Sequence, residues 1–170
     1  MKNLTKFLKN KLGSNKDPKT TLKQEILLGN LEFVQDFTKN HYYDVHYKDQ
    51  QMHSYLDYAC LSGNVELIRF FNQAKVKLGS LLYKTHNQSK FLQHIINLKE
   101  AGYDLNSLDA LGYAPVHYAA LLKFEKVLKQ LLEWDVKLLQ SSIYGDNPVF
   151  SDHAWSKRGG VLPGIYTSRS

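Results

Sequence analysis

One phrase of the sequence returns after a fixed interval, and this recurrence constrains the fold more than any other feature. Residues 112–120 read G-Y-A-P-V-H-Y-A-A, and thirty-three residues after Gly112 the chain reads G-D-N-P-V-F from Gly145. Glycine and proline occupy the same places in both copies. A fixed period near 33 residues is typical of stacked repeats, in which each repeat buries its apolar surface against its neighbours.

Further copies of the pattern cover most of the chain. G-N-L-E-F-V from Gly29 matches G-N-V-E-L-I from Gly63, thirty-four residues later. The hairpin phrase A-G-Y-D-L-N at 101–106 has a weaker counterpart at 43–49. Together these phrases place repeats at about residues 20–47, 48–78, 79–107 and 108–140, with a partial fifth from Ser141.

These phrases resemble the ankyrin repeat, whose signature is Gly-x-x-Pro-apolar-His-x-Ala-Ala followed by an Ala-Gly-x-Asp hairpin. The resemblance implies an all-α fold: a solenoid of stacked helix pairs with hairpin loops, about four repeats plus a partial fifth. The copies are unequal. Residues 54–57 read S-Y-L-D where the family has Thr-Pro-Leu-His, and the third repeat lacks this phrase and is about six residues short before Phe91.

Residue spacing within the repeats favours helices. Pro115 suits the first turn of a helix, because its missing N–H would be unpaired there anyway. Small side chains at Ala119 and Ala120 let neighbouring helices approach closely. The second helices of two repeats show apolar faces at helical spacing, formed by Val65, Leu67, Ile68, Phe70 and Phe71 and by Val127, Leu128, Leu131 and Leu132.

The chain divides into residues 1–19, a repeat domain at 20–155 and a C-terminal tail at 156–170. The first segment carries an apolar helical stripe among lysines, formed by Leu4, Phe7, Leu8 and Leu12. We favour a cap that packs on Ile26 and Leu27. The alternative is a basic amphipathic helix, residues 1–12, that makes weak contact with an anionic membrane surface.

Charge and composition limit the classes of partner. The net charge of +6 comes from residues 1–23, which hold seven lysines and one acid, and the rest of the chain is neutral. No basic groove follows the repeats, so nucleic acid is disfavoured as a partner. No apolar run reaches the length of a membrane span, and no secretory signal is recognised. The one cysteine, Cys60, stands at the second Ala-Ala position and is predicted to be a packed thiol, which fits the reducing cytoplasm.

Candidate chemistry is sparse, and we predict no metal, no cofactor, no catalytic residue and no enzyme. His41, His46 and His53 are close in sequence, but their spacing fits neither a helical pair nor a hairpin clip for zinc. No nucleophile elbow, phosphate loop or H-E-x-x-H motif occurs. For His117 the resemblance implies a structural role, in which its ring holds the turn between repeats by hydrogen bonds.

The resemblance places a partner on the hairpin tips and the exposed side of the first helices. The implied binding residues are Gln50, Gln51, His53, Leu61 and Ser62 in the second repeat, Ala110, Leu111, Tyr113, Leu121 and Leu122 in the fourth, and Ile143, Tyr144 and Asp146 in the fifth, with Trp134 on the rim. An apolar, aromatic cluster in the fourth repeat has the composition of a binding hot spot. Two alternatives remain: the tail covers the cluster, or Leu121 and Leu122 pack against the neighbouring repeat.

The leading hypothesis is therefore a monomeric adaptor or inhibitor that binds another protein in the cytoplasm. The lysine bias and the divergent repeats lean towards an effector that an intracellular bacterium delivers into host cytosol through a secretion system. A membrane-associated scaffold that uses the basic N-terminal helix is the alternative.

Overall fold

The structure is a computed structural model that describes residues 17–40 and 43–145. These residues form eight α-helices and no strand, with one isolated antiparallel bridge between Lys48 and Ser54. The expected all-α fold is confirmed for this part of the chain. No helix within it has the length and apolar character needed to cross a membrane.

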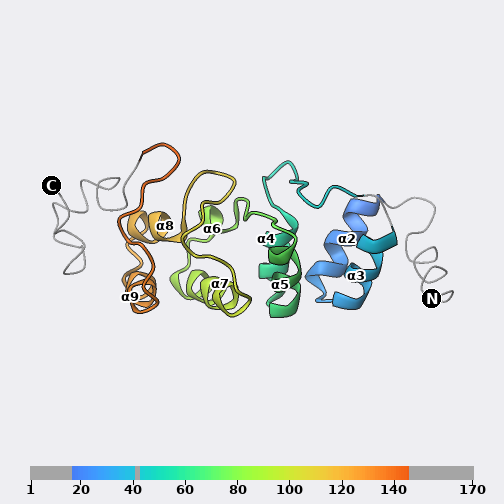
Figure 1. Cartoon of the computed structure of the whole chain (residues 1–170), viewed down its shortest axis with the longest axis horizontal. Coiled ribbons are helices and arrows are strands. Elements are labelled where there is room, and N and C mark those ends of the chain that lie inside the picture. Colours follow the sequence, from blue (N-terminus) through green and yellow to red (C-terminus); the bar gives the residue numbers. More distant parts are fainter. Residues whose placement is uncertain (1–16, 41–42, 146–170) are drawn as a thin grey trace.

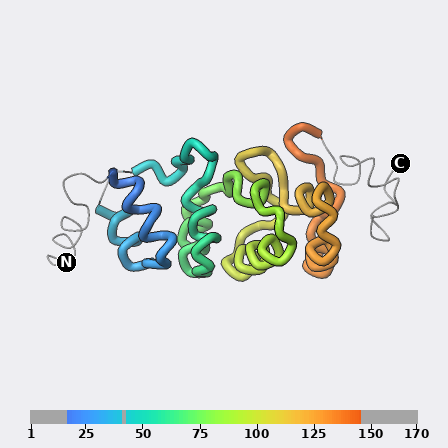
Figure 2. Tube along the Cα trace, turned by 180° about the vertical axis from the view of Figure 1, so that it is seen from behind, coloured from blue at the N-terminus to red at the C-terminus, as the bar shows by residue number. Residues whose placement is uncertain are grey.

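The helices follow one another in pairs along the long axis of the molecule (Figure 1). Loops lie along one edge, the first helix of each pair lies in the middle, and the second helix lies along the other edge. The view from behind shows the same arrangement (Figure 2). The four pairs are α2 (Pro18–Leu27) with α3 (Leu31–Asn40), α4 (Tyr55–Ser62) with α5 (Val65–Gln73), α6 (Leu81–Lys84) with α7 (Gln88–Glu100), and α8 (Pro115–Leu121) with α9 (Glu125–Glu133).

Successive pairs cover each other's apolar faces. First helices pack on first helices, α2 on α4 and α6 on α8, and second helices pack as α5 on α7 and α7 on α9. Ala59 and Ala119 are fully buried in the first helices, where a small side chain permits close approach. Cys60 is 2% exposed, as predicted, and burial raises the pKa of its thiol well above the usual value. One pair alone could not bury these residues.

The turns between paired helices explain the recurring Gly-Asn phrase. Gly63 ends α4 in the left-handed conformation at φ 73°, which glycine adopts without steric cost. Asn64 then caps α5, since its side-chain oxygen accepts the N–H of Leu67 at 3.2 Å. The Asn64 side-chain amide also donates to the carbonyl of Gly29 at 3.2 Å. One asparagine therefore starts a helix and links two successive turns.

The third pair departs from the others at its first helix. Helix α6 has four residues, and the Ser80 side chain makes no capping bond to it. Leu81 and Leu82 are still buried, so this single turn keeps its place against α8. The shortfall predicted before Phe91 falls at this helix.

Two predicted orientations are wrong. Leu132 is 53% exposed whereas Val127, Leu128 and Leu131 are buried, because at about 100° per residue Leu132 lies furthest from the centre of the buried face. Leu122, expected to face solvent, is half-buried and packs against the core at the end of α8. Leu122 therefore belongs to the packed side chains of the described residues, while Leu121 is 52% exposed.

Several predictions fall outside the described residues. These are the apolar stripe of the N-terminal segment, the helix start at Pro148 and the tail at 156–170. Of the segment 1–19, the structure describes residues 17–19, and Pro18 begins α2.

Candidate functional site

A half-buried carboxylate, Asp49, organises the hairpin that precedes α4. One Asp49 oxygen accepts the backbone N–H groups of Gln51 and His53 at 2.9 and 3.0 Å. The other accepts the hydroxyl of Tyr58 from α4. Burial alone would raise the pKa of Asp49, but the hydrogen bonds from Tyr58 and the backbone outweigh it and lower the pKa. The hairpin is thereby fixed to the first helix of its own pair.

The same network returns sixty residues later, in the hairpin before α8. One Asp109 oxygen accepts the N–H groups of Leu111 and Tyr113 at 2.9 and 3.1 Å, and the other accepts the Tyr118 hydroxyl at 2.6 Å. Asp109 is 4% exposed, and this deeper burial raises its pKa despite the hydrogen bonds. Two hairpins of unrelated loop sequence are thus braced in the same way.

Neighbouring hairpins are also joined to each other through the backbone. Three backbone hydrogen bonds connect successive loops. The N–H of Ser80 donates to the carbonyl of Met52 at 2.9 Å, the N–H of Ala110 to the carbonyl of Leu78 at 2.7 Å, and the N–H of Ile143 to the carbonyl of Gly112 at 2.9 Å. The loop edge is therefore a continuous hydrogen-bonded structure.

His117 and Asp57 hold successive pairs together from matching positions. In α8, the Nδ1 atom of His117 accepts the N–H of Ala114 at 2.9 Å, so the proton is on Nε2, which donates to the carbonyl of Gln140 at 2.9 Å. In α4, the Asp57 carboxylate accepts the N–H groups of Ser54 at 3.2 Å and Gly79 at 2.8 Å. A carboxylate suits this position of α4 because its partner in the next loop, the N–H of Gly79, is a donor, whereas the partner of His117 is a carbonyl group.

Burial dominates the electrostatics of Asp57. The side chain is fully buried, and this raises the pKa of the carboxyl to about 7, although hydrogen bonds from Gly79 and Ser54 oppose the rise. Because its pKa differs from that of an unfolded aspartate, Asp57 is expected to make the free energy of unfolding depend on pH.

We define the tip face as the loop residues 43–54, 101–114 and 137–145 together with the exposed side of α2, α4, α6 and α8. On its C-terminal half lies a row of aromatic rings: Tyr83 is 6.4 Å from Tyr118, Tyr118 is 5.6 Å from Tyr113, and Tyr113 is 5.5 Å from Tyr144, centroid to centroid. Tyr83 and Tyr144 are 57% and 67% exposed. Leu121 adds an exposed aliphatic side chain.

The structure brings some of the predicted binding residues to this face as exposed side chains and places others in supporting positions. The exposed ones are Gln50, Gln51, Leu61, Leu121, Ile143 and Tyr144. The half-buried ones are His53, Ser62, Ala110, Leu111, Tyr113 and Leu122. Asp146 lies outside the described residues.

Trp134 is not beside the aromatic row. It follows α9 on the second-helix side, is half-buried, and its ring lies 5.3 Å from the Nζ atom of Lys99 in α7. These contacts do not support the predicted position of Trp134 on the rim of the binding surface.

Sequence reasoning missed three residues of the tip face: Lys23, Tyr83 and Lys84. Tyr83 and Lys84 belong to α6, where the repeat phrase is absent from the sequence. The sixty-residue interval would have found all three, because Lys23 matches Tyr83 and Lys84 matches Tyr144.

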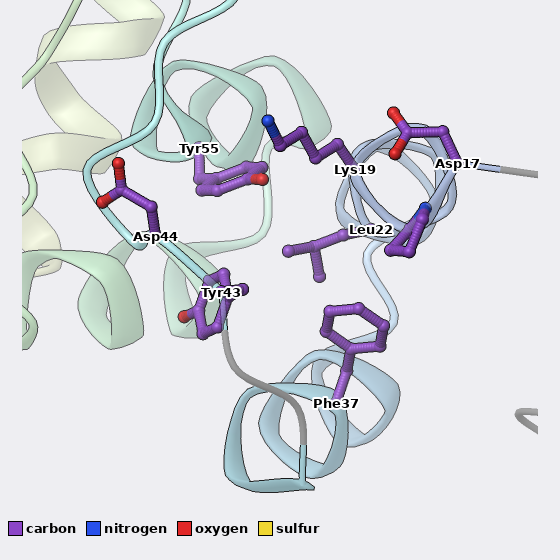
Figure 3. A pocket seen from close by; sticks show the side chains of 8 residues that line it. Asp17, Lys19, Leu22, Phe37, Tyr43, Asp44 and Tyr55 are labelled. Carbon is purple, nitrogen blue, oxygen red and sulfur yellow. The ribbon is translucent and has the colours of Figure 1, made fainter.

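A cavity of about 260 Å³ lies among α2, α3, α4 and the loop between α3 and α4, away from the aromatic row (Figure 3). The rings of Phe37, Tyr43 and Tyr55 and the side chain of Leu22 surround it, with Asp17 and Asp44 on opposite sides. Burial raises the pKa of the Tyr55 hydroxyl well above its usual value. The walls are suited to an apolar group, and the two carboxylates do not converge for acid–base chemistry.

Within residues 17–40 and 43–145, no group of three or more His, Cys, Asp or Glu residues could hold a metal ion. No family model matches the chain. No curated protein matches its sequence. The function must therefore be argued from the geometry.

Proposed function

We propose that this chain is an ankyrin-repeat protein that binds a partner protein through the tip face, as an adaptor or an inhibitor. Two observations support the repeat assignment: the thirty-three-residue recurrence of glycine and proline, and the Asp–Tyr brace that returns after sixty residues. In this proposal the four helix pairs are stacked repeats of a solenoid. The binding surface would serve equally in the cytoplasm or in a host cell reached as a bacterial effector.

The observation that carries the binding function is the exposed apolar cluster on a braced edge. Tyr144, Tyr83 and Leu121 are each more than half exposed on one face, and a group of exposed aromatic and aliphatic side chains is typical of a binding surface. The loops beneath them are held by Asp109 and by bonds between hairpins. Anchors that are already ordered lose little entropy on binding, and aromatic anchors carry much of the energy of many interfaces.

A matched pair of leucines tests this proposal. Leu121 on the tip face and Leu132 on the second-helix side are 52% and 53% exposed. Immobilised wild type, Leu121→Lys and Leu132→Lys are incubated with lysate of a eukaryotic cell, and the captured proteins are quantified by mass spectrometry. We expect specific partners that Leu121→Lys loses and Leu132→Lys keeps. If both variants capture the same proteins as wild type, the tip face is not the binding surface.

A further inference from the structure

The tip face has two chemistries, which appear when matching positions sixty residues apart are compared. Tyr58 and Tyr118 are the bracing tyrosines of the two hairpins. His53 lies 5.4 Å from the ring of Tyr58, centroid to centroid, and Tyr113 lies 5.6 Å from Tyr118 at the matching position. An imidazole in the N-terminal half therefore stands where the C-terminal half has a phenol ring.

The next matching pair likewise has a basic side chain in the N-terminal half and a phenol ring in the C-terminal half. The Nζ atom of Lys23 lies 4.8 Å from the ring centroid of Tyr58, and Tyr83 lies 6.4 Å from Tyr118. Each residue comes from the preceding first helix, Lys23 from α2 and Tyr83 from α6. A cation thus covers one bracing tyrosine and an aromatic ring covers the other.

A third pair lies one hairpin further along the face. Lys84 donates from Nζ to the carbonyl of Gln51 at 2.8 Å, while the ring of Tyr144, sixty residues later, packs against the ring of Tyr113. Both reach back to the preceding hairpin. At three matching positions the N-terminal half therefore has a nitrogen base and the C-terminal half has a tyrosine. The bases are Lys23, His53 and Lys84, and the tyrosines are Tyr83, Tyr113 and Tyr144.

Two cations of the N-terminal half, Lys23 and Lys84, are not paired with a carboxylate of the described residues. Asp49 carries a negative charge beneath them, but its oxygens bind the Tyr58 hydroxyl and two backbone N–H groups and neither lysine, so both lysine Nζ atoms are available to an acidic partner. Lys19 adds a further cation, with its Nζ atom 4.1 Å from the ring centroid of Tyr47.

We infer that the tip face binds a protein segment that is acidic at one end and bulky and apolar at the other. This inference rests on the proposed partner-binding function. The acidic end lies over α2 and α4, where Lys23 and Lys84 complement its charge. The apolar end lies over α8, against Tyr83, Leu121 and Tyr144. Complementary charge then sets the direction in which the segment lies, and apolar contact supplies most of the affinity.

Selection from a phage-displayed library of random 16-residue peptides tests the inference. Wild type is expected to enrich peptides with Asp or Glu in one half and aromatic or aliphatic residues in the other. The Lys23→Glu, Lys84→Glu variant should lose the preference for acidic residues. A control with the same charge change, Lys126→Glu with Lys129→Glu on α9, should keep it. Circular dichroism and thermal unfolding of all three proteins establish that they fold alike.

Affinity of one enriched peptide, measured by fluorescence polarisation, gives the size of the effect. We expect the tip-face charge reversal to weaken binding about tenfold or more, and the α9 control to leave it within about twofold. Wild-type affinity should also fall as salt is added. Enriched peptides without acidic residues, or insensitive to the tip-face reversal, would overturn the two-part partner and leave the proposed function standing. No enrichment by wild type would overturn both.

Discussion

At the scale of single residues, the most informative feature is that Asp57 and His117 do one task with opposite hydrogen-bonding roles. Each satisfies the N-terminal N–H of its own helix and reaches the next loop. The two side chains differ in type because their partners differ: Gly79 offers a backbone N–H as donor, and Gln140 offers a backbone carbonyl as acceptor. Substitution of either residue leaves two buried polar groups unpaired.

His117→Ala is expected to lower the free energy of unfolding by about 1–3 kcal/mol, the usual cost of buried groups that lose their partners. The Ala114 N–H and the Gln140 carbonyl lose their bonds in this variant. Urea unfolding measures the effect, and His86→Ala, at an exposed site, serves as the control. An unchanged urea midpoint would show that His117 has no structural role.

Asp57 should make stability depend on pH with a defined sign. Burial raises its folded pKa to about 7, above the value near 4 of an unfolded aspartate. Between these values the folded state binds more protons, so the Asp57 contribution to stability is full below about pH 4 and is lost as pH rises to about 7. The slope for one proton is at most about 1.4 kcal/mol per pH unit. Urea midpoints across this range should separate wild type from Asp57→Asn, and parallel curves would contradict the assignment.

At the scale of helices and turns, the joints between pairs depend on close backbone approach. Gly79 is an example: a Cβ atom there would lie 2.0 Å from the carbonyl oxygen of Met52 and 2.7 Å from an Asp57 oxygen. Backbone atoms cannot move aside as a flexible side chain can. This glycine is required for space, whereas Gly63 is required for its left-handed φ.

Gly79→Ala is therefore expected to destabilise the fold by about 3 kcal/mol or more, at the upper end of overpacking costs. Gly63→Ala should cost about 1–2 kcal/mol, because nothing lies within 4 Å of its Cβ and only the left-handed conformation is penalised. Chemical denaturation of both variants compares the two mechanisms. Equal costs would mean that the joint relaxes to admit a methyl group.

The elements also show what could be read from the sequence and what could not. Pro115 begins its helix as predicted, and the Gly-Asn turns recur as expected, because these residues have local conformational preferences. The exposure of Leu132 and the packing of Leu122 depend on contacts with other pairs, which helical spacing does not specify. Tyr83 differs from these two, because the sixty-residue interval that relates Asp49 to Asp109 also relates Lys23 to Tyr83 and would have placed it on the tip face.

At the scale of the whole molecule, the row of helix pairs has a weak point in its middle. Contacts run chiefly between neighbouring pairs, so stability is distributed along the row and not held in one central core. Helix α6 has a single turn and no side-chain cap, whereas Ser54 and Asp57 form a capping box at α4. The tip face passes over α6, between its cationic and aromatic halves.

Amides of α6 should therefore exchange with solvent faster than those of α4 and α8. Few helical bonds hold this turn, and it has no side-chain cap. By contrast, Ser54 accepts an N–H of the first turn of α4, and His117 accepts the N–H of Ala114 at the start of α8. Hydrogen exchange followed by mass spectrometry, with peptides that separate residues 81–84 from α7, measures the difference. The exchange rate of α6 should rise in low urea before that of either neighbour, because its opening leaves α5, α7 and α9 in contact. Protection of α6 equal to that of α4 would show that the buried side chains of Leu81 and Leu82 hold the turn as firmly as a full helix, and that the row opens as one unit.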